Sequence, residues 1–471
     1  MPFEETKRAE IKDGKKIFEQ ISSYIGKDLL DRWYPLAVDK EHGGYFTDIS
    51  CDWKILPVQH KMIVTQARYV WTASKAALMF GSDAYADAAK HGYDFLRNFM
   101  WDQKNGGFYQ MRDYRGQVCD FLGFFDEKRT YGNAFAVYGL AALYELTHDW
   151  KVLDFAREGF KWIEDHACDR KQKGYFQFLA PDGTPFNASS SYKTKAYDDA
   201  ELGYKDQNSS IHLLEAYTEL YKVWPDSQLK QKLTDLLALI RDVITTKKGH
   251  MNLFFHNDWT PLSFRDVPKE IREKNYRLDH VSFGHDYETG FLMLEASHVL
   301  GLKDDTATLS TAKRMVDHAI ENGWDKENGG FFDAGYYFAG DARCTIIQST
   351  KNWWAQAEAL NVLLLMARIF PDNKVYPEYF SRQWQYVDRY LLDHENGDWF
   401  EGGLDKEPHF KTGPKGHIWK CNYHTGRAMM NCMKMLAEDG FALTKEGKFR
   451  KLKEDSDEFI SHWQNTARKI A

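Results

Sequence analysis

Hydrophobic residues recur with a helical period along most of the chain. Apolar positions spaced i, i+3 and i+4 predict amphipathic helices rather than strands. The segments with this pattern are 13–33, 61–81, 84–99, 130–147, 150–165, 208–222, 228–246, 285–301, 307–322, 351–369, 377–391, 423–437 and 453–469. Most of them come as pairs joined by short polar connections. The pattern therefore predicts an all-α protein built from helix pairs.

A short turn of glycine followed by an aromatic residue separates the helix pairs. The turns are centred on Gly44, Gly107, Gly174, Gly249, Gly330 and Gly397, at intervals of 63, 67, 75, 81 and 67 residues. The fourth copy is the most divergent, because Met251 stands where the other copies have an aromatic ring. Six units of two helices and a turn cannot bury their apolar faces singly, so we expect them to close into a ring.

The repeat predicts an (α/α)6 barrel with one helix of each pair inside and one outside. An open α-solenoid is the alternative, although its repeats are usually about half this length. No stretch has the Pro/Ser/Gly composition of a linker, so we expect one domain over residues 1–471. The most irregular connections are 170–207, 247–284 and 324–350, and we expect them to form loops over one mouth of the barrel, where binding residues concentrate.

Composition and charge narrow the range of partners. The net charge is −7 and the charged residues are interspersed, which gives no electrostatic footprint for nucleic acid or an anionic membrane. A neutral substrate fits this charge distribution better than nucleic acid or an anionic membrane does. The aromatic content of 15% suits either a cavity lined by rings or a large core.

The cysteines and the N-terminus bear on the cellular setting. The six cysteines are scattered without a CxxC pair, which argues against a disulfide framework or a structural zinc site. The first residues are polar and lack an apolar core, and no run of about 18 apolar residues occurs anywhere. We therefore expect a cytoplasmic protein without a membrane segment.

The stretch 282–290 contains the clearest candidate chemistry. His285 and Glu288 are three residues apart at the start of a predicted helix, so they share one face. A histidine oriented by a neighbouring carboxylate can move a proton on and off a substrate. The alternative is a capped, solvated helix start.

Further polar residues lie on predicted inner helices, where burying them without partners would be costly. Three histidines, His212, His285 and His424, stand near helix starts in three different repeats. In a six-fold ring these starts meet at one mouth, so we expect a shared cavity. The other polar or aromatic candidates are Arg68, Tyr131, Asn208, Glu288, Trp354, Glu358 and Trp419.

Three chemistries could use this set. A metal site could draw on His212, His285 and Glu288, but no HExxH or similarly dense motif is present, so we expect no metal. Glycoside hydrolysis would need two carboxylates such as Glu288 and Glu358. Proton transfer at a carbon next to a carbonyl suits the histidines better. No GxxxxGK[ST] or GxGxxG motif occurs, so we expect no nucleotide cofactor.

Several motifs in register resemble the N-acylglucosamine 2-epimerase superfamily, and most closely its cellobiose 2-epimerase branch. They are the segments 128–138, 208–226, 284–288, 353–359 and 423–427, and the similarity runs in order from about Arg68 to about Met430. The resemblance implies an (α/α)6 barrel and an epimerase or isomerase without a metal. It also implies a reducing-end aldose substrate that reacts after ring opening.

The resemblance assigns roles residue by residue. His285 and His424 resemble an acid/base pair on opposite faces of C2, and His212 resembles a third histidine that helps ring opening and handles protons on the enediol oxygens. The remaining candidates resemble contacts to O1 and O2 (Arg68, Tyr131, Asn208), carboxylates that orient histidines (Glu288, Glu358) and rings stacked on the sugars (Trp354, Trp419).

The chain also departs from the family pattern. Ser209-Ser210 stands where the family usually has Thr-His, and Asn422 and Thr425 stand where the family usually has Pro or Asn around Tyr423. We also expect added segments around 170–207, 250–280 and after 437. These additions leave the size of the substrate open.

The expected activity is a carbohydrate 2-epimerase that acts on a mono- or disaccharide, as a monomer or homodimer. The alternatives are an aldose-ketose isomerase of the mannose isomerase type, an N-acylglucosamine 2-epimerase, or a glycan-binding barrel without catalysis.

Overall fold

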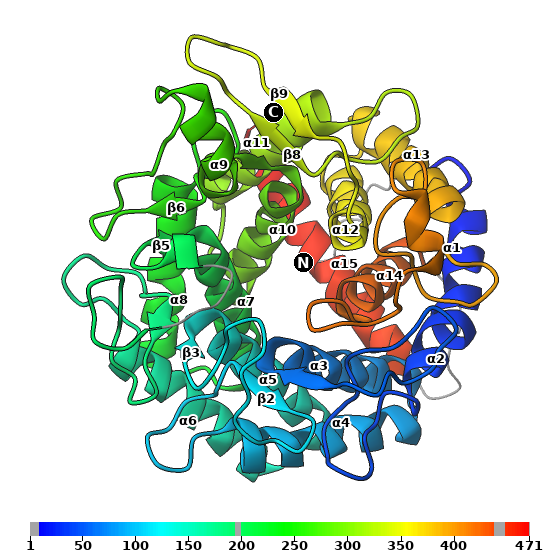
Figure 1. Cartoon of the computed structure of the whole chain (residues 1–471). Helices are drawn as coiled ribbons and strands as arrows, with labels where there is room; N and C mark the ends of the chain where they lie inside the picture. Colours follow the sequence, from blue (N-terminus) through cyan, green and yellow to red (C-terminus); the bar gives the residue numbers. More distant parts are fainter. Residues whose placement is uncertain (1–8, 194–198, 438–447, 471) are drawn as a thin grey trace.

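Six helices surround a central axis in the computed structural model, which describes residues 9–193, 199–437 and 448–470 (Figure 1). The inner helices are α3 (Ile63–Phe80), α5 (Thr130–Thr147), α7 (Gln207–Val223), α10 (Phe283–Val299), α12 (Trp353–Ile369) and α14 (Tyr423–Leu436). Each inner helix contacts the next, and α14 contacts α3 to close the ring. The structure therefore confirms the (α/α)6 barrel.

An outer helix packs against each inner helix. The outer helices are α4 (Asp83–Phe95), α6 (Trp150–His166), α8 (Ser227–Leu239), α11 (Thr306–Gly323) and α13 (Val375–Tyr390). The sixth outer helix is α1 (Gly14–Tyr24), which packs against α14. The beginning of the chain thus completes the last repeat. Short helical turns extend three of these helices: η1 (Ile25–Leu30) with α2 (Asp31–Trp33), η2 (Leu96–Met100) and η4 (Ile240–Ile244).

Burial explains which helix of a pair lies inside. The inner helix α12 is buried along its whole length except at Trp354. The outer helix α6 buries one stripe that includes Val152, Phe155, Phe160 and Ile163 and leaves its other face to solvent. A helix that is apolar almost all round needs partners on every side, whereas an amphipathic helix needs one.

All six glycine turns are closed in the same way, although the fourth is one residue shorter than the others. An isolated β-bridge closes each of them, pairing Val38 with Tyr45, Trp101 with Phe108, Cys168 with Tyr175, Thr245 with Met251, Trp324 with Phe331 and Leu392 with Trp399. The divergent fourth turn is therefore a genuine member of the repeat. Gly107 shows why glycine is required, because it has a φ of +75° and a Cβ there would lie 2.4 Å from the Trp162 ring.

Buried ion pairs join four of these turns to the residues just before the next inner helix, and in the sixth turn Asp393 pairs with Lys415. Each of the four pairs joins a lysine two residues before an inner helix to the first aspartate of the turn, with Nζ–O distances of 2.7–2.8 Å: Lys61–Asp39, Lys128–Asp102, Lys205–Asp169 and Lys351–Asp325. In the fourth connection Thr246 and Val281 stand at the corresponding positions. The ion pairs fix where each inner helix begins, and hence where its first polar residues point.

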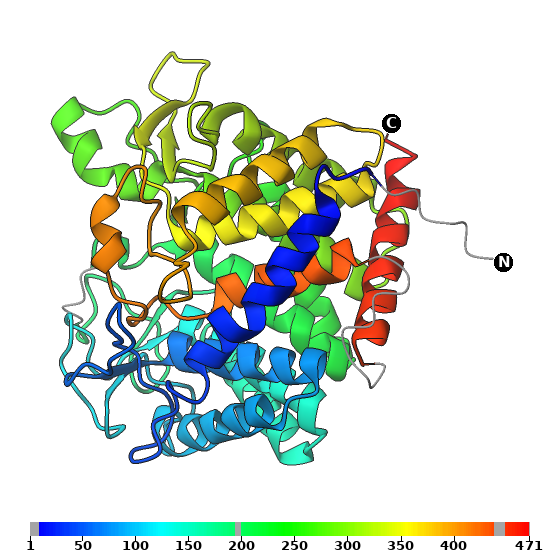
Figure 2. The ribbon, with the colours of Figure 1, turned by 90° about the vertical axis from the view of Figure 1, so that its right-hand side faces the viewer.

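Short antiparallel strands link neighbouring connections at the end of the barrel where the inner helices begin. The pairs are β1 (His60–Met62) with β2 (Met111–Asp113), β3 (Lys128–Arg129) with β4 (Phe178–Leu179), and β5 (Lys205–Asp206) with β6 (Phe254–Phe255). A three-stranded sheet joins β7 (Val281–Ser282), β8 (Ala334–Tyr336) and β9 (Thr345–Gln348). Figure 2 shows these connections gathered at one end of the molecule, as predicted for the mouth.

One helix of the mouth escapes the sequence pattern. Helix α9 (Lys269–Asp279) lies inside the connection 247–284, which was predicted to be a loop. Its residues are mostly charged and only Leu278 is buried, so no apolar stripe marks it as a helix. Two 3₁₀ turns, η3 (Asp199–Glu201) and η5 (Pro408–Thr412), also lie in the long connections.

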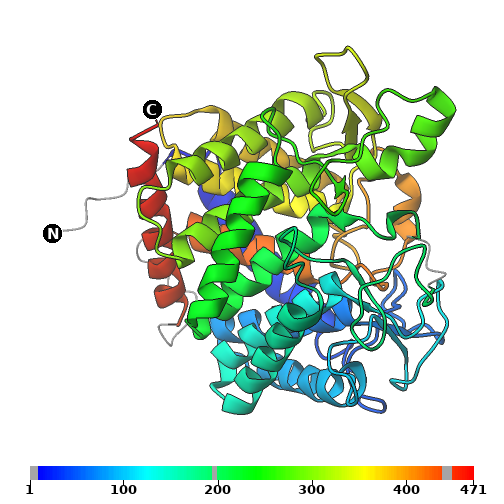
Figure 3. The ribbon, with the colours of Figure 1, turned by 90° about the vertical axis from the view of Figure 1, so that its left-hand side faces the viewer.

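Helix α15 (Lys448–Ala467) covers the opposite end of the barrel (Figure 3). It contacts α3, α11, α12 and α14. The barrel thus has an open mouth built from loops and strands and a far end closed by a helix. Among the described residues, no helix has both the length and the apolar character needed to cross a bilayer.

Candidate active site

The three predicted histidines meet at the mouth of the barrel. His285 and His424 stand in the first turns of α10 and α14, and both pack beside the indole of Trp354, with ring centroids 4.7 and 5.8 Å from it. His212, in the second turn of α7, packs against the ring of Tyr131 at 5.1 Å. The structure therefore brings together side chains from the starts of five inner helices, including the three histidines that the sequence placed there.

His424 belongs to a charged network. Its Nδ1 lies 2.8 Å from Oε1 of Glu358, so the ring donates its Nδ1 proton to the carboxylate and keeps a lone pair on Nε2. Burial lowers the pKa of His424 well below its usual value, and Arg68 and Arg427 lower it further. The ring is neutral at neutral pH and can accept a proton.

His285 has a different orienting partner. Its Nδ1 lies 3.0 Å from the hydroxyl of Ser282, the last residue of strand β7, directly before α10. Burial lowers the pKa of His285 to about 3, and the neighbouring His212 contributes to the shift. The prediction that Glu288 orients His285 is therefore wrong, because a hydroxyl holds this ring and Glu288 points elsewhere.

His212 is held by a carboxylate that the sequence reasoning missed. Nδ1 of His212 lies 2.8 Å from Oε2 of Glu215, and Oε1 of Glu215 accepts a hydrogen bond from the hydroxyl of Tyr423 at 2.5 Å. Glu215 follows His212 by three residues, the same spacing that drew attention to His285 and Glu288. That spacing could have identified it.

Arg427 connects three buried glutamates below the histidines. Its guanidinium hydrogen-bonds Glu215, lies 2.5 Å from Glu288 and lies 2.7 Å from Glu358. Each carboxylate has at most 2% of its side chain exposed. Glu288 therefore contacts Arg427, and its Oε1 is 4.0 Å from Nδ1 of His424. Arg427 belongs to the motif 423–427, whose sequence alone does not show these contacts.

The three carboxyl groups differ in acidity. Burial raises the pKa of Glu288 to about 7 and the pKa of Glu358 to about 6. The negative charge of Glu358 raises the pKa of Glu288 further, whereas Arg427 lowers the pKa of both groups. Burial also acts on Glu215, but Arg427 and the hydrogen bond with His212 outweigh it and lower the pKa to about 2. Two of the three groups thus titrate near neutral pH.

Glu288, Glu358 and His424 offer ligand atoms within 4.8 Å of one another, the spacing of a metal site. The guanidinium of Arg427 already lies against Oε1 of both carboxylates. A divalent cation in the same place would meet this positive charge at close range. The residues present therefore do not fit a metal ion.

The predicted substrate contacts line the mouth above this network. Arg68 donates hydrogen bonds to the Tyr131 hydroxyl at 3.0 Å and to the Trp419 carbonyl at 3.4 Å, and its guanidinium lies over the Phe135 ring. Asn208, Tyr131 and Trp419 line one cavity of about 390 Å³. Oδ1 of Asn208 has no hydrogen-bond partner there among the described residues.

The chain is similar to a family of known proteins over most of its length. Residues 44–428 match the profile of the family described as N-acylglucosamine 2-epimerase (GlcNAc 2-epimerase). The chain is 29% identical over 426 residues to a cellobiose 2-epimerase of Bacteroides fragilis, covering 89% of this chain and 98% of that protein. It is 24% identical to a D-mannose isomerase of Marinomonas mediterranea, covering 86% of this chain and 94% of that protein.

A solved structure gives the same picture of the fold. The cellobiose 2-epimerase of Bacillus thermoamylovorans B4167 superimposes with a TM-score of 0.76 at 24% identity, covering 89% of this chain and 99% of that one. The resemblance inferred from the motifs is thus confirmed, and the family profile spans most of the sequence. The chain belongs to the N-acylglucosamine 2-epimerase family.

Proposed function

We propose that the protein is a carbohydrate 2-epimerase that interconverts glucose-type and mannose-type sugars at the reducing end. The observation that carries the proposal is that two imidazoles from different repeats, His285 and His424, both pack against the same indole, Trp354. Both rings are neutral at neutral pH, so either one can act as a base. The names of the relatives support the same class of reaction.

The reaction exchanges the proton on C2 of the open-chain sugar. One histidine removes the proton, and the electron pair delocalises onto the aldehyde oxygen as an enediolate. The other histidine, after taking up a proton from solvent, delivers it to the opposite face. A single base would return the proton to the face it left, whereas two bases allow inversion. The catalyst is then restored by proton exchange with solvent.

The enediolate needs positive charge in a pocket with little water. Arg68 is 4% exposed, and its guanidinium is fixed by Tyr131 and by the Phe135 ring, so it is placed before any charge develops. Preorganised cations of this kind stabilise a developing oxyanion without reorganisation. His212, held by Glu215, is suited to carry protons to and from the sugar oxygens during ring opening.

A disaccharide suits the mouth better than a single sugar ring. The cavity beside Tyr131 and Trp419 extends to Gln177 and Glu201, which belong to the added connection 170–207. Its polar side chains can hydrogen-bond hydroxyl groups of a second ring, and Trp419 offers a stacking surface. We therefore place the reducing end at the histidines and the second sugar in this cavity.

An aldose-ketose isomerase is the second candidate. The same groups could move the O2 proton to O1 and reprotonate C1 instead of C2, which gives a ketose. The similarity to a D-mannose isomerase favours keeping this alternative.

The test is incubation with cellobiose, mannobiose, mannose and N-acetylmannosamine in D₂O, followed by NMR. Deuterium at C2 of a newly formed aldose epimer supports the epimerase, and accumulation of a ketose supports the isomerase. Retained binding without any exchange would show a glycan-binding barrel. We also propose a cytoplasmic location and a monomer or homodimer, which cell fractionation and sedimentation would test.

A further inference from the structure

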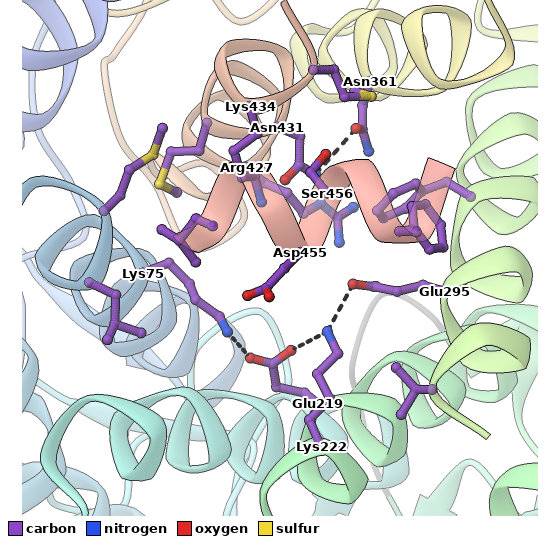
Figure 4. Close-up of a pocket in the computed structure, with 18 of the residues that line it drawn as sticks. Lys75, Glu219, Lys222, Glu295, Asn361, Arg427, Asn431, Lys434, Asp455 and Ser456 are labelled. Atoms are coloured by element: carbon purple, nitrogen blue, oxygen red, sulfur yellow. Dashed lines mark hydrogen bonds and ion pairs between the residues drawn. The ribbon is translucent and has the colours of Figure 1, made fainter. Parts of the chain in front are cut away.

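A second cavity of about 390 Å³ lies at the far end of the barrel, between the last turns of the inner helices and α15 (Figure 4). Its walls are partly apolar, with Phe291, Leu365, Met430 and Phe459 among them. The volume is in the range of small-molecule sites, which are typically apolar with a few placed polar groups. Arg427 lines this cavity and also bonds the catalytic carboxylates, so it separates the two sites.

Most charges in the far-end cavity neutralise one another. Lys75 forms ion pairs with Glu145 and Glu219, and Lys222 lies 3.2 Å from Glu219 and 2.9 Å from Glu295 (Figure 4). Two lysines thus satisfy three glutamates, and all five side chains line the cavity. They form a fixed polar wall rather than a set of free ligands.

Two donors in the same cavity remain unpaired. Lys434 has no carboxylate within 4.0 Å and no hydrogen bond among the described residues, although it is only partly exposed. Asn361 is 0% exposed; its Oδ1 accepts a hydrogen bond from Asn431 at 3.2 Å, while its Nδ2 has no partner within the described part of the chain. Buried donors without an acceptor cost stability, which points to a missing acceptor.

The two donors line the cavity from neighbouring helices, α14 and α12. Asn431 and Lys434 are three residues apart on α14 and therefore share a face, and Asn431 bonds Asn361 on α12. Burial lowers the pKa of Lys434 to about 8; Lys75 and Lys222 lower it as well, and Glu295 and Glu145 oppose them. Burial thus disfavours the charged amine, which has no acceptor of its own among the described residues.

We propose that the far-end cavity binds a small organic monocarboxylate, with Lys434 and Asn361 donating to its two oxygens. One cation and one amide match the charge and the acceptors of one carboxylate. The apolar residues Phe291 and Phe459 cover the organic body. Asp455 and Glu458 of α15 also line the cavity and are exposed, so their negative charge selects against a phosphate dianion.

Isothermal titration calorimetry with butyrate, phenylacetate and inorganic phosphate tests this proposal on the full chain. We expect saturable binding of at least one monocarboxylate at one site per chain and none of phosphate. Lys434→Met keeps the length of the side chain and removes the donor, so affinity should fall by about tenfold or more. Lys248→Met, on a different surface, is the matched control and should bind as the wild type does.

A proton-linkage measurement sharpens the test. At pH 8 the Lys434 amine is about half protonated, and a bound carboxylate raises its pKa, so binding should take up roughly half a proton. Calorimetry in buffers of different ionisation enthalpy measures this uptake. If circular dichroism shows that Lys434→Met is unfolded, the variants Lys434→Gln and Asn361→Ser replace it in the test.

Three results would overturn the proposal: no saturable binding of either monocarboxylate at about 20 mM, equal binding by the wild type and the Lys434 and Asn361 variants, or binding of phosphate alone. The readout is binding rather than turnover, so it stands or falls independently of the proposed epimerase activity.

Discussion

The two histidines of the proposed acid/base pair have unlike surroundings. His424 hydrogen-bonds Glu358 within a network of three carboxylates and one guanidinium, whereas His285 is held by the neutral hydroxyl of Ser282. A carboxylate stabilises the imidazolium that forms when a histidine accepts a proton, and a hydroxyl fixes only the direction of the ring. The difference indicates that the imidazolium of His424 has a carboxylate partner that the imidazolium of His285 lacks, and that the two faces of the sugar are handled unequally.

Removing either ring should have the largest effect. His285→Asn and His424→Asn should each lower the rate of epimerisation by about 10³-fold or more, because general acid/base catalysis commonly supplies a factor of this size. Melting temperatures should stay near that of the wild type. His394→Asn, at an exposed surface position, is the control. Substantial epimerisation by either active-site variant would remove that histidine from the proposed pair.

Glu358→Gln should lower kcat by about 10²-fold, since the amide cannot stabilise the His424 imidazolium. KM should change little, because Glu358 is fully buried beneath the ring and does not line the sugar cavity. Steady-state kinetics with cellobiose measures both quantities. A large rise in KM at unchanged kcat would show that Glu358 acts in substrate binding instead.

Ser282→Ala should have a smaller effect, a reduction of kcat by about tenfold, because only the orientation of His285 is lost. Ser282→Thr retains a hydroxyl and should recover part of the rate. If Ser282→Ala were as damaging as Glu358→Gln, the proposed inequality between the two histidines would be wrong.

The pH dependence of kcat/KM should reflect the titration of the carboxylates rather than that of the imidazole rings. The pKa values of Glu288 and Glu358 are raised to about 7 and about 6, so both groups become protonated as the pH falls through this range. Protonation removes the negative charge that stabilises the His424 imidazolium, so kcat/KM should fall with decreasing pH below about 7.

Glu288→Gln is the variant that tests this assignment. Without the higher of the two ionisations, the acid limb of kcat/KM should move toward pH 6. His285, with a pKa of about 3, stays neutral throughout the accessible range. An acid limb that did not move in Glu288→Gln would assign it to another group.

The sequence predicted the barrel well because its signal is local. Apolar periodicity marks twelve barrel helices and α15, and the glycine turns mark the repeats even where Met251 replaces an aromatic residue. Helix α9 was missed because it carries almost no buried residue. Periodicity reports burial, so a charged helix over a loop leaves no pattern to read.

The site was predicted less completely because its contacts are distant in sequence. Spacing placed Glu288 on the same face as His285, but it could not show that Arg427, 139 residues away, would bind that carboxylate. The Arg427–Glu215 contact spans 212 residues. Motif spacing identifies which face of a helix a residue occupies, and closure of the ring decides what lies opposite.

The most direct test of the central claim is the loss of C2 hydrogen in D₂O from each epimer separately, measured by NMR with the two single histidine variants. One base on each face predicts that His285→Asn still exchanges one epimer without inverting it, and that His424→Asn exchanges only the other. Exchange of the same epimer by both variants would contradict the two-face arrangement.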